Sequence, residues 1–127
     1  MVIKQEIINV FDVRIVTERF FENERTQWIV MLHDALGSSA QWKLFPEMLF
    51  IQTQCNVLVY DRKGYGRSEG SVLPRPISFM HDEAKNDLPE LLKQLKIVNP
   101  IVIGHSDGGS IALMFANEMN CKAIISI

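Results

Sequence analysis

Short apolar runs recur along the chain, separated by segments that resemble turns or helices. Four of these runs are almost continuous, which is typical of strands buried on both faces of a sheet. They cover residues 28–33, 56–60, 101–103 and 122–127. Near the start, residues 7–11 and 14–20 alternate partly around Asp12. This pattern predicts an antiparallel hairpin at the edge of the sheet.

The segment after the run at 28–33 predicts a helix. It follows a glycine turn at Gly37 and contains Pro46, which a helix tolerates in its first turn. Its apolar residues should face the core. They are Trp42, Phe45, Met48 and Leu49.

A second helical segment, residues 78–97, follows a loop around Pro74. Leucines spaced three and four positions apart give it one apolar face. They are Leu88, Leu91, Leu92 and Leu95. Pro89 should kink this helix, or restart it with Asp87 as the cap. Strands that alternate with helices predict an α/β fold, with a mostly parallel sheet and helices on both faces.

A serine between two glycines follows the strand at residues 101–103. The sequence Gly104-His-Ser106-Asp-Gly108 leads directly into an apolar helix, and a strand, Gly-x-Ser-x-Gly and a helix form the context of a nucleophile elbow. The glycines let neighbouring backbone pass closely while the serine is held in a strained conformation. Its hydroxyl then stands beside the N–H groups and the positive end of the helix. The pattern favours a nucleophilic Ser106 over a chance match in a glycine turn.

Composition excludes several classes of partner. The chain has 127 residues and a net charge of −2, which fits one domain and gives no electrostatic reason to expect nucleic acid or an anionic membrane. No apolar run approaches the ~20 residues of a membrane span, and the first residues lack the apolar core of a signal peptide. Cys55 and Cys121 show no metal or redox spacing and are expected to be free thiols. We therefore expect a cytoplasmic protein.

Three motifs of the chain resemble those of the α/β-hydrolase family, and they occur in the family's order. They are His33-Asp-Ala-Leu-Gly-Ser38, Asp61-x-x-Gly-x-Gly-x-Ser68 and Gly104-His-Ser-Asp-Gly-Gly109. The resemblance covers nearly all of the chain. It implies that residues 1–127 are a partial domain of this family, truncated before the cap and the last strands.

The resemblance also implies an activity. Ser106 would be the nucleophile of a serine hydrolase that cleaves a carboxylic ester or related acyl bond in a small molecule, without a cofactor. The backbone N–H groups of Asp107 and Ala35 would form the oxyanion hole. A serine at this position argues against the dehalogenase and epoxide-hydrolase branches, which use an aspartate there. The Asp107 side chain is expected to complement the helix dipole, or else to disfavour anionic acyl groups.

His33, Asp34 and His105 are candidate binding residues beside this serine. His33 should hydrogen-bond the loop that follows its strand. Asp34 stands where many members of the family have glycine, so it would tighten or re-aim that loop. His105 should point to the opposite side of its strand from Ser106.

The proton acceptor that a serine nucleophile needs is missing from the pattern. The family places its catalytic acid and histidine downstream of the serine, where this chain offers only Glu118 and no histidine after His105. We therefore expect weak or no activity from the chain alone. Two alternatives stay open: a non-catalytic half-domain that acts as an assembly partner, and metal-assisted hydrolysis. The metal ligands would come from His33, Asp34, His81, Asp82, His105 and Asp107.

The final strand, residues 122–127, should lie at an open edge of the sheet. An apolar edge strand with unpaired N–H and C=O groups invites pairing with another chain. We therefore expect a homo-oligomer, aggregation, or a separate C-terminal fragment that completes the sheet.

Overall fold

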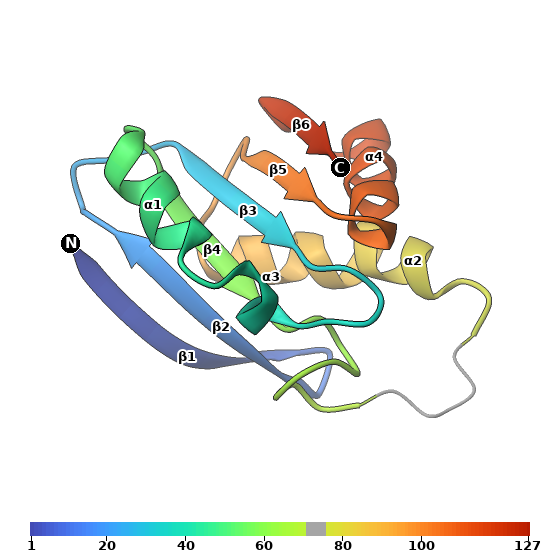
Figure 1. Ribbon diagram of the computed structural model, residues 1–127. Helices are drawn as coiled ribbons and strands as arrows, with labels where there is room; N and C mark the ends of the chain where they lie inside the picture. The colour runs from blue at the N-terminus through green and yellow to red at the C-terminus, as the bar shows by residue number, and fades with distance from the viewer. Residues whose placement is uncertain (71–75) are drawn as a thin grey trace.

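The computed structural model of the chain describes residues 1–70 and 76–127, so the predicted loop around Pro74 lies outside them. Within these residues, six strands form one sheet in the order β1-β2-β4-β3-β5-β6 (Figure 1). Their bounds are β1 Val2–Val10, β2 Val13–Phe21, β3 Trp28–Leu32, β4 Asn56–Tyr60, β5 Ile101–Gly104 and β6 Ala123–Ser126. The β1–β2 hairpin joins β4 antiparallel, and β4, β3, β5 and β6 run parallel. The mostly parallel sheet predicted from the sequence is confirmed.

Helices cover both faces of this sheet. On one face lies α1 (Phe45–Gln52), whose Phe50 packs with apolar residues of β3 and β4. On the other face, α3 (Leu88–Gln94) and α4 (Asp107–Glu118) form a larger apolar cluster with the strands. Shorter helical segments are η1 (Ser39–Trp42), α2 (Phe79–Asp82) and η2 (Glu83–Asp87). Each of these described helices is too short to cross a membrane.

The central strand β3 shows why its sequence is continuously apolar. Ile29 and Met31 pack against α1 on one face, whereas Val30 and Leu32 pack in the cluster of α3 and α4 on the other. All four are almost inaccessible to solvent. A strand with helices on both sides has no polar face, so period-two alternation disappears.

The apolar side predicted for the first helix is only half right: Trp42 and Leu49 pack against the cluster that contains Phe50, but the other two residues do not. Phe45 and Met48 are exposed, and Pro46 and Phe50 are buried instead. The chain does not form one helix there: η1 ends at Trp42, and the next residue, Lys43, has a φ of 52°. This break resets the rotation of α1 about its axis. Pro46 does lie in the first turn of α1, as predicted.

The second predicted helix is helical from Phe79 to Gln94, three residues short of the predicted end, and the cap proposed for its restart is wrong. Asp87 has helical backbone angles and makes no capping bond with its side chain. The wider π turn of η2 precedes Pro89, which lies in the first turn of α3. A π turn lets the helix continue past a proline, which has no N–H to donate, so the chain does not need to begin a new helix. The leucine face is confirmed at its centre, where Leu88, Leu91 and Leu92 are buried.

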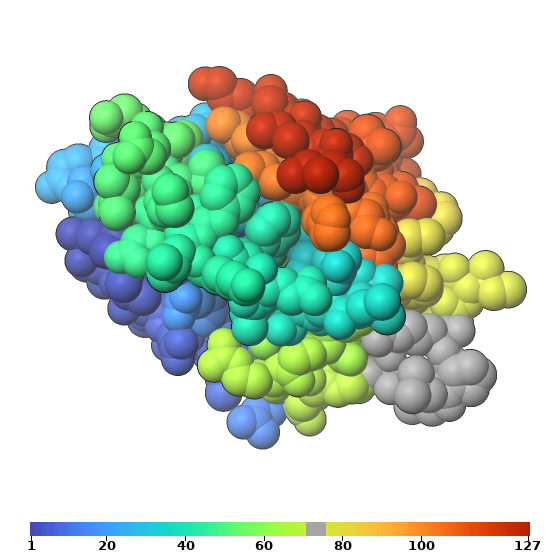
Figure 2. Space-filling model, viewed as in Figure 1, coloured from blue at the N-terminus to red at the C-terminus, as the bar shows by residue number. Residues whose placement is uncertain are grey.

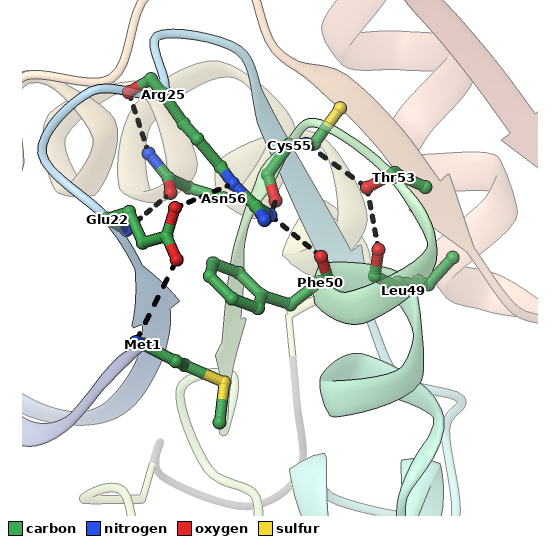
Figure 3. Close-up of polar contacts among 8 residues, drawn as sticks. All are labelled: Met1, Glu22, Arg25, Leu49, Phe50, Thr53, Cys55 and Asn56. Atoms are coloured by element: carbon green, nitrogen blue, oxygen red, sulfur yellow. Dashed lines mark hydrogen bonds and ion pairs between the residues drawn. The ribbon is translucent and has the colours of Figure 1, made fainter.

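At the amino ends of β3 and β4, Arg25 ties the loop between β2 and β3 to the rest of the fold (Figure 3). Its Nη1 donates to the carbonyl oxygens of Phe50 and Cys55, at 2.7 and 2.8 Å. The guanidinium lies 3.8 Å from the centre of the Phe50 ring. Asn56 donates from Nδ2 to the Arg25 carbonyl at 2.9 Å and accepts from the Glu22 N–H at 2.9 Å. These contacts hold the end of the sheet opposite to the serine.

The strand β6 lies at one edge of the sheet, with β5 as its neighbour. We expect the 127-residue chain to self-associate at micromolar concentration, because Ile125 on this edge is 49% exposed and such edges pair with other chains. Ile125→Lys should lower the mass measured by sedimentation. Leu113→Lys, which changes a similarly exposed residue of α4, should leave it unchanged. A parent chain that sediments as a monomer would contradict this expectation.

Candidate active site

Ser106 lies in the β5–α4 turn (residues 104–109), between the end of β5 and the first residue of α4. Its backbone has φ 58° and ψ −120°, a region that residues other than glycine rarely adopt. The residue is exposed to solvent. The geometry is the one predicted from the motif: a strained serine at the carboxyl end of a strand.

Two glycines of this turn are required by close backbone contacts. A Cβ atom on Gly104 would lie 2.1 Å from the carbonyl oxygen of Gly108. A Cβ atom on Gly108 would lie 2.4 Å from the carbonyl oxygen of Leu32. Any side chain at either position would therefore push α4 away from the ends of β3 and β5.

The turn is fixed by backbone hydrogen bonds on both sides. The His105 N–H donates to the Leu32 carbonyl at 3.1 Å, and the Ser106 N–H donates to the Ile127 carbonyl at 2.8 Å. Asp107 is the first residue of α4, so its N–H cannot be used within the helix. The positive end of the helix dipole lies at the same place. An N–H donor and a favourable field thus adjoin Ser106.

Across the turn lies the β3–η1 loop (residues 33–38), which begins at the buried His33. The Arg62 N–H donates to His33 Nε2 at 3.0 Å, so Nε2 is the acceptor nitrogen of a neutral ring. Nδ1 then carries the hydrogen and donates to the Asp34 carbonyl at 2.7 Å. Burial lowers the pKa of His33, against the raising effect of that carbonyl. Since both ring nitrogens are engaged, His33 has no site to accept a proton from Ser106.

Arg62 connects the two segments. It is 1% exposed, and its Nη2 donates both to the His33 carbonyl at 2.8 Å and to Asp107 Oδ1 at 2.8 Å. The guanidinium also lies 4.8 Å from the centre of the Tyr65 ring. The carboxylate of Asp107 is therefore partnered by a buried cation.

Asp34 and His105, two of the predicted binding residues, meet on the exposed side of the turn. Asp34 Oδ2 lies 3.4 Å from His105 Nδ1, and the Gln41 side-chain amide donates to Asp34 Oδ1 at 2.8 Å. A pocket of about 440 Å³ opens here. It is lined by His33, Asp34, Gln41, Trp42, Lys43 and His105. Figure 2 shows the β3–η1 loop, in cyan and teal, between the orange residues that follow β5 and the yellow-green segment after β4.

Residues 61–68, which follow β4, hold the β3–η1 loop through hydrogen bonds of Asp61. Asp61 accepts the Ser39 N–H at 2.7 Å and the Arg67 N–H at 3.0 Å. Burial raises the pKa of Asp61, but these N–H donors outweigh it and hold the pKa below its usual value. Ser68 donates from its hydroxyl to the Asp61 carbonyl. The motif from Asp61 to Ser68 is thus a brace for the loop.

Sequence reasoning missed Arg62. Its motif marked a turn after β4, but nothing in the pattern paired it with Asp107, 45 positions later.

His81 of α2, a candidate metal ligand, does not line the pocket beside the serine. In the part of the chain that the structure describes, no three His, Cys, Asp or Glu side chains gather closely enough to hold a metal ion.

A buried acid lies behind Arg62. The Tyr60 hydroxyl donates to Glu83 Oε2 at 3.0 Å. Burial, and then the charge of Asp87, raise the pKa of Glu83 to about 7, while Arg62 and Lys63 oppose the rise. Glu83 therefore changes charge near neutral pH.

The fold and the site define a class of protein: an α/β sheet with an exposed serine held between a strand end and a helix start. The chain belongs to the family described as alpha/beta hydrolase fold, whose model matches residues 27–127. The family expected from the sequence motifs is confirmed.

Two curated relatives show similar identity. The sn-1-specific diacylglycerol lipase ABHD11 of Danio rerio is 33% identical over 88 residues, and the carbamate hydrolase RutD of Caulobacter segnis is 32% identical over 88 residues. Each match includes 69% of this chain but only 26% and 32% of the respective relative. The chain thus spans about a third or less of the length of these relatives.

Solved structures agree on the fold. A CIB-like hydrolase from Thermoplasma acidophilum has a TM-score of 0.84 at 22% identity, covering 100% of this chain and 63% of its own. A bacterial membrane phospholipase A has a TM-score of 0.85 at 14% identity, covering 98% of this chain and 39% of its own.

Glu83 gives the fold a measurable pH dependence. Its pKa rises from 4.5 to about 7 in the folded chain, so its contribution to stability is complete below pH 4.5 and is lost as the pH rises through 7. Between pH 4.5 and 8, the unfolding free energy of the parent chain should fall by an amount on the order of 3 kcal/mol because Glu83 ionises. Glu83→Gln should not show this fall. Urea unfolding at both pH values measures it. Glu90→Gln should keep the pH dependence of the parent's unfolding free energy. If Glu83→Gln kept it too, Glu83 would not be the group responsible.

Proposed function

We propose that this chain provides the nucleophile and the oxyanion hole of a serine hydrolase, which cleaves a neutral carboxylic ester or related acyl bond through an acyl-enzyme on Ser106. The observation that carries this proposal is the backbone of Ser106. A φ of 58° holds an exposed serine directly before the first N–H of α4. Strain at a polar, exposed position is typical of a functional residue.

In the proposed reaction, Ser106 Oγ attacks the acyl carbonyl carbon and its proton passes to a base. The carbonyl oxygen becomes an oxyanion, which accepts hydrogen bonds from the N–H groups of Asp107 and Ala35. Each such donor contributes roughly 3–4 kcal/mol of transition-state stabilisation. The base then gives the proton to the ester oxygen, the C–O bond breaks and the alcohol leaves an acyl-enzyme. Water attacks the acyl carbon in the same way, and the bond to Ser106 Oγ breaks to release the acid and restore the serine hydroxyl.

The substrate class follows from the pocket and the relatives. The Asp34 carboxylate lies in the pocket wall, which favours a neutral acyl group over an anionic one. The Asp107 carboxylate has less influence than its position beside Ser106 implies, because Arg62 neutralises it. The names of the relatives describe a diacylglycerol lipase and a carbamate hydrolase, and both reactions take place at an uncharged acyl carbonyl.

The base is expected from outside the 127 residues. His33 uses both ring nitrogens, and the chain spans only about a third of its curated relatives. By itself it should therefore react slowly, through the oxyanion hole alone. The same observation favours one alternative, a non-catalytic half-domain that acts as an assembly partner through the edge of β6.

The decisive test replaces Ser106. In a protein that carries this chain with a complete hydrolase domain, Ser106→Ala should lower kcat for a p-nitrophenyl ester by at least about 1,000-fold. Ser110→Ala, which changes an exposed serine one helical turn later, should keep the parent's rate. Equal turnover in the Ser106→Ala variant would refute the nucleophile.

The 127-residue chain itself allows a second measurement. A fluorophosphonate should modify Ser106 far more slowly than it modifies a hydrolase with a complete triad, because the buried His33 has both ring nitrogens engaged and cannot accept the serine proton. Mass spectrometry of the labelled peptide identifies the residue. A rate typical of a complete serine hydrolase would show that a base is present within the chain.

A further inference from the structure

Arg62 lies where the two segments that supply the proposed N–H donors come together. We propose that Arg62 is a positioning residue for the oxyanion hole: it holds the β3–η1 loop and the first turn of α4 in register, so that the N–H groups of Ala35 and Asp107 converge on one oxyanion. This inference rests on the proposed function and extends it to a residue that does not touch the substrate.

One nitrogen atom makes the connection. Nη2 of Arg62 donates to the carbonyl of His33 on one segment and to Oδ1 of Asp107 on the other, both at 2.8 Å. His33 stands two residues before Ala35, and Asp107 itself carries the second donor. Movement of the guanidinium would therefore shift both donor segments together.

The backbone of Arg62 acts on the first donor through His33. Its N–H donates to His33 Nε2 at 3.0 Å, which leaves the ring hydrogen on Nδ1. Nδ1 donates to the Asp34 carbonyl at 2.7 Å. That carbonyl and the Ala35 N–H belong to one planar trans peptide unit and point in opposite directions. The tautomer of His33 thus sets the direction of the Ala35 N–H.

Arg62 also controls the charge beside the serine. An unpaired carboxylate at Asp107 would oppose an oxyanion one residue away. The guanidinium neutralises it from the buried side, where the low dielectric strengthens the interaction. The Asp107 N–H can then act as a donor without its own side chain cancelling the effect.

A contribution to stability alone does not explain the Arg62–Asp107 ion pair. Buried ion pairs often contribute no more to folding than apolar residues of similar size. Within the described residues, Arg62 Nε and Asp107 Oδ2 are buried without a hydrogen-bond partner. What the pair supplies beyond an apolar contact is a fixed geometry between the β3–η1 loop and the first turn of α4.

Arg25 offers a matched control. It too is a largely buried arginine whose Nη1 donates to two carbonyl oxygens and whose guanidinium lies against an aromatic ring. It lies at the amino ends of β3 and β4 (Figure 3), whereas Ser106 follows the carboxyl end of the parallel strand β5. Arg25→Met should destabilise the fold without moving either donor.

The test compares Arg62→Met, Arg62→Met combined with Asp107→Leu, and Arg25→Met in the 127-residue chain. The double variant replaces the buried pair by apolar groups, so it should regain the melting temperature that the single variant loses. The amide proton chemical shift of Ala35, measured by NMR, reports on the orientation of that N–H. Fluorophosphonate modification of Ser106, separated into kinact and KI and corrected for the folded fraction, reports on the oxyanion hole.

We expect both Arg62 variants to shift the Ala35 amide proton resonance, because the N–H changes direction, and to lower kinact about 10- to 100-fold with KI unchanged. Arg25→Met should change neither quantity. A double variant with the parent's kinact and Ala35 amide chemical shift would overturn the inference and leave Arg62 a purely structural residue.

Failure of the proposed function would look different. Modification of the Ser106→Ala chain at the parent's rate would refute the serine nucleophile and remove the meaning of kinact. The chemical shift of the Ala35 amide would still decide whether Arg62 positions the loop, because that measurement does not depend on the Ser106 hydroxyl.

Discussion

The carboxyl end of the sheet depends on one constraint: α4 starts with no side chain between its first turn and the backbone of β3 and β5. Gly104 and Gly108 provide that space, since a Cβ atom on either would lie 2.1 or 2.4 Å from a backbone oxygen. The close approach places Ser106 at positive φ, which costs roughly 1–3 kcal/mol. Ile111 and Phe115, buried on the sheet, each contribute roughly 1.5–3 kcal/mol and offset this strain. The strain of the serine is thus supported by ordinary helix-on-sheet packing.

The same close packing decides which charges can lie behind the serine. His33 is neutral because its two ring nitrogens face an N–H donor and a carbonyl. Arg62 and Asp107 form a pair whose charges cancel. His33 and the Arg62–Asp107 pair therefore bring no net charge to the buried side of the β5–α4 turn, and the positive end of α4 keeps its effect at the surface. For the proposed acyl transfer, this leaves the field of the helix available to the oxyanion.

Sequence patterns predicted what depends on local physics. The strands follow from apolar runs, and the turn at Ser106 follows from the glycine spacing. The exposure of Phe45 and Met48 was not predictable, because the break at Lys43 has positive φ without a glycine to signal it. The π turn before Pro89 was hidden for a similar reason, since its residues have ordinary helix-forming character. The pairing of Arg62 with Asp107 depends on the strand order β4-β3-β5, which no local pattern specifies.

The strand order also places Ser106 close to the edge of the sheet formed by β6. The loops after β4 and β3 occupy one side of Ser106, where Arg62 and His33 are fully engaged. The other side belongs to β6, whose continuation accepts the Ser106 N–H at Ile127. Parallel strands end at the same edge of a sheet, so a strand added parallel to β6 would bring its following loop toward Ser106. In the proposed mechanism, the segment that completes the sheet is therefore also placed to supply the proton acceptor.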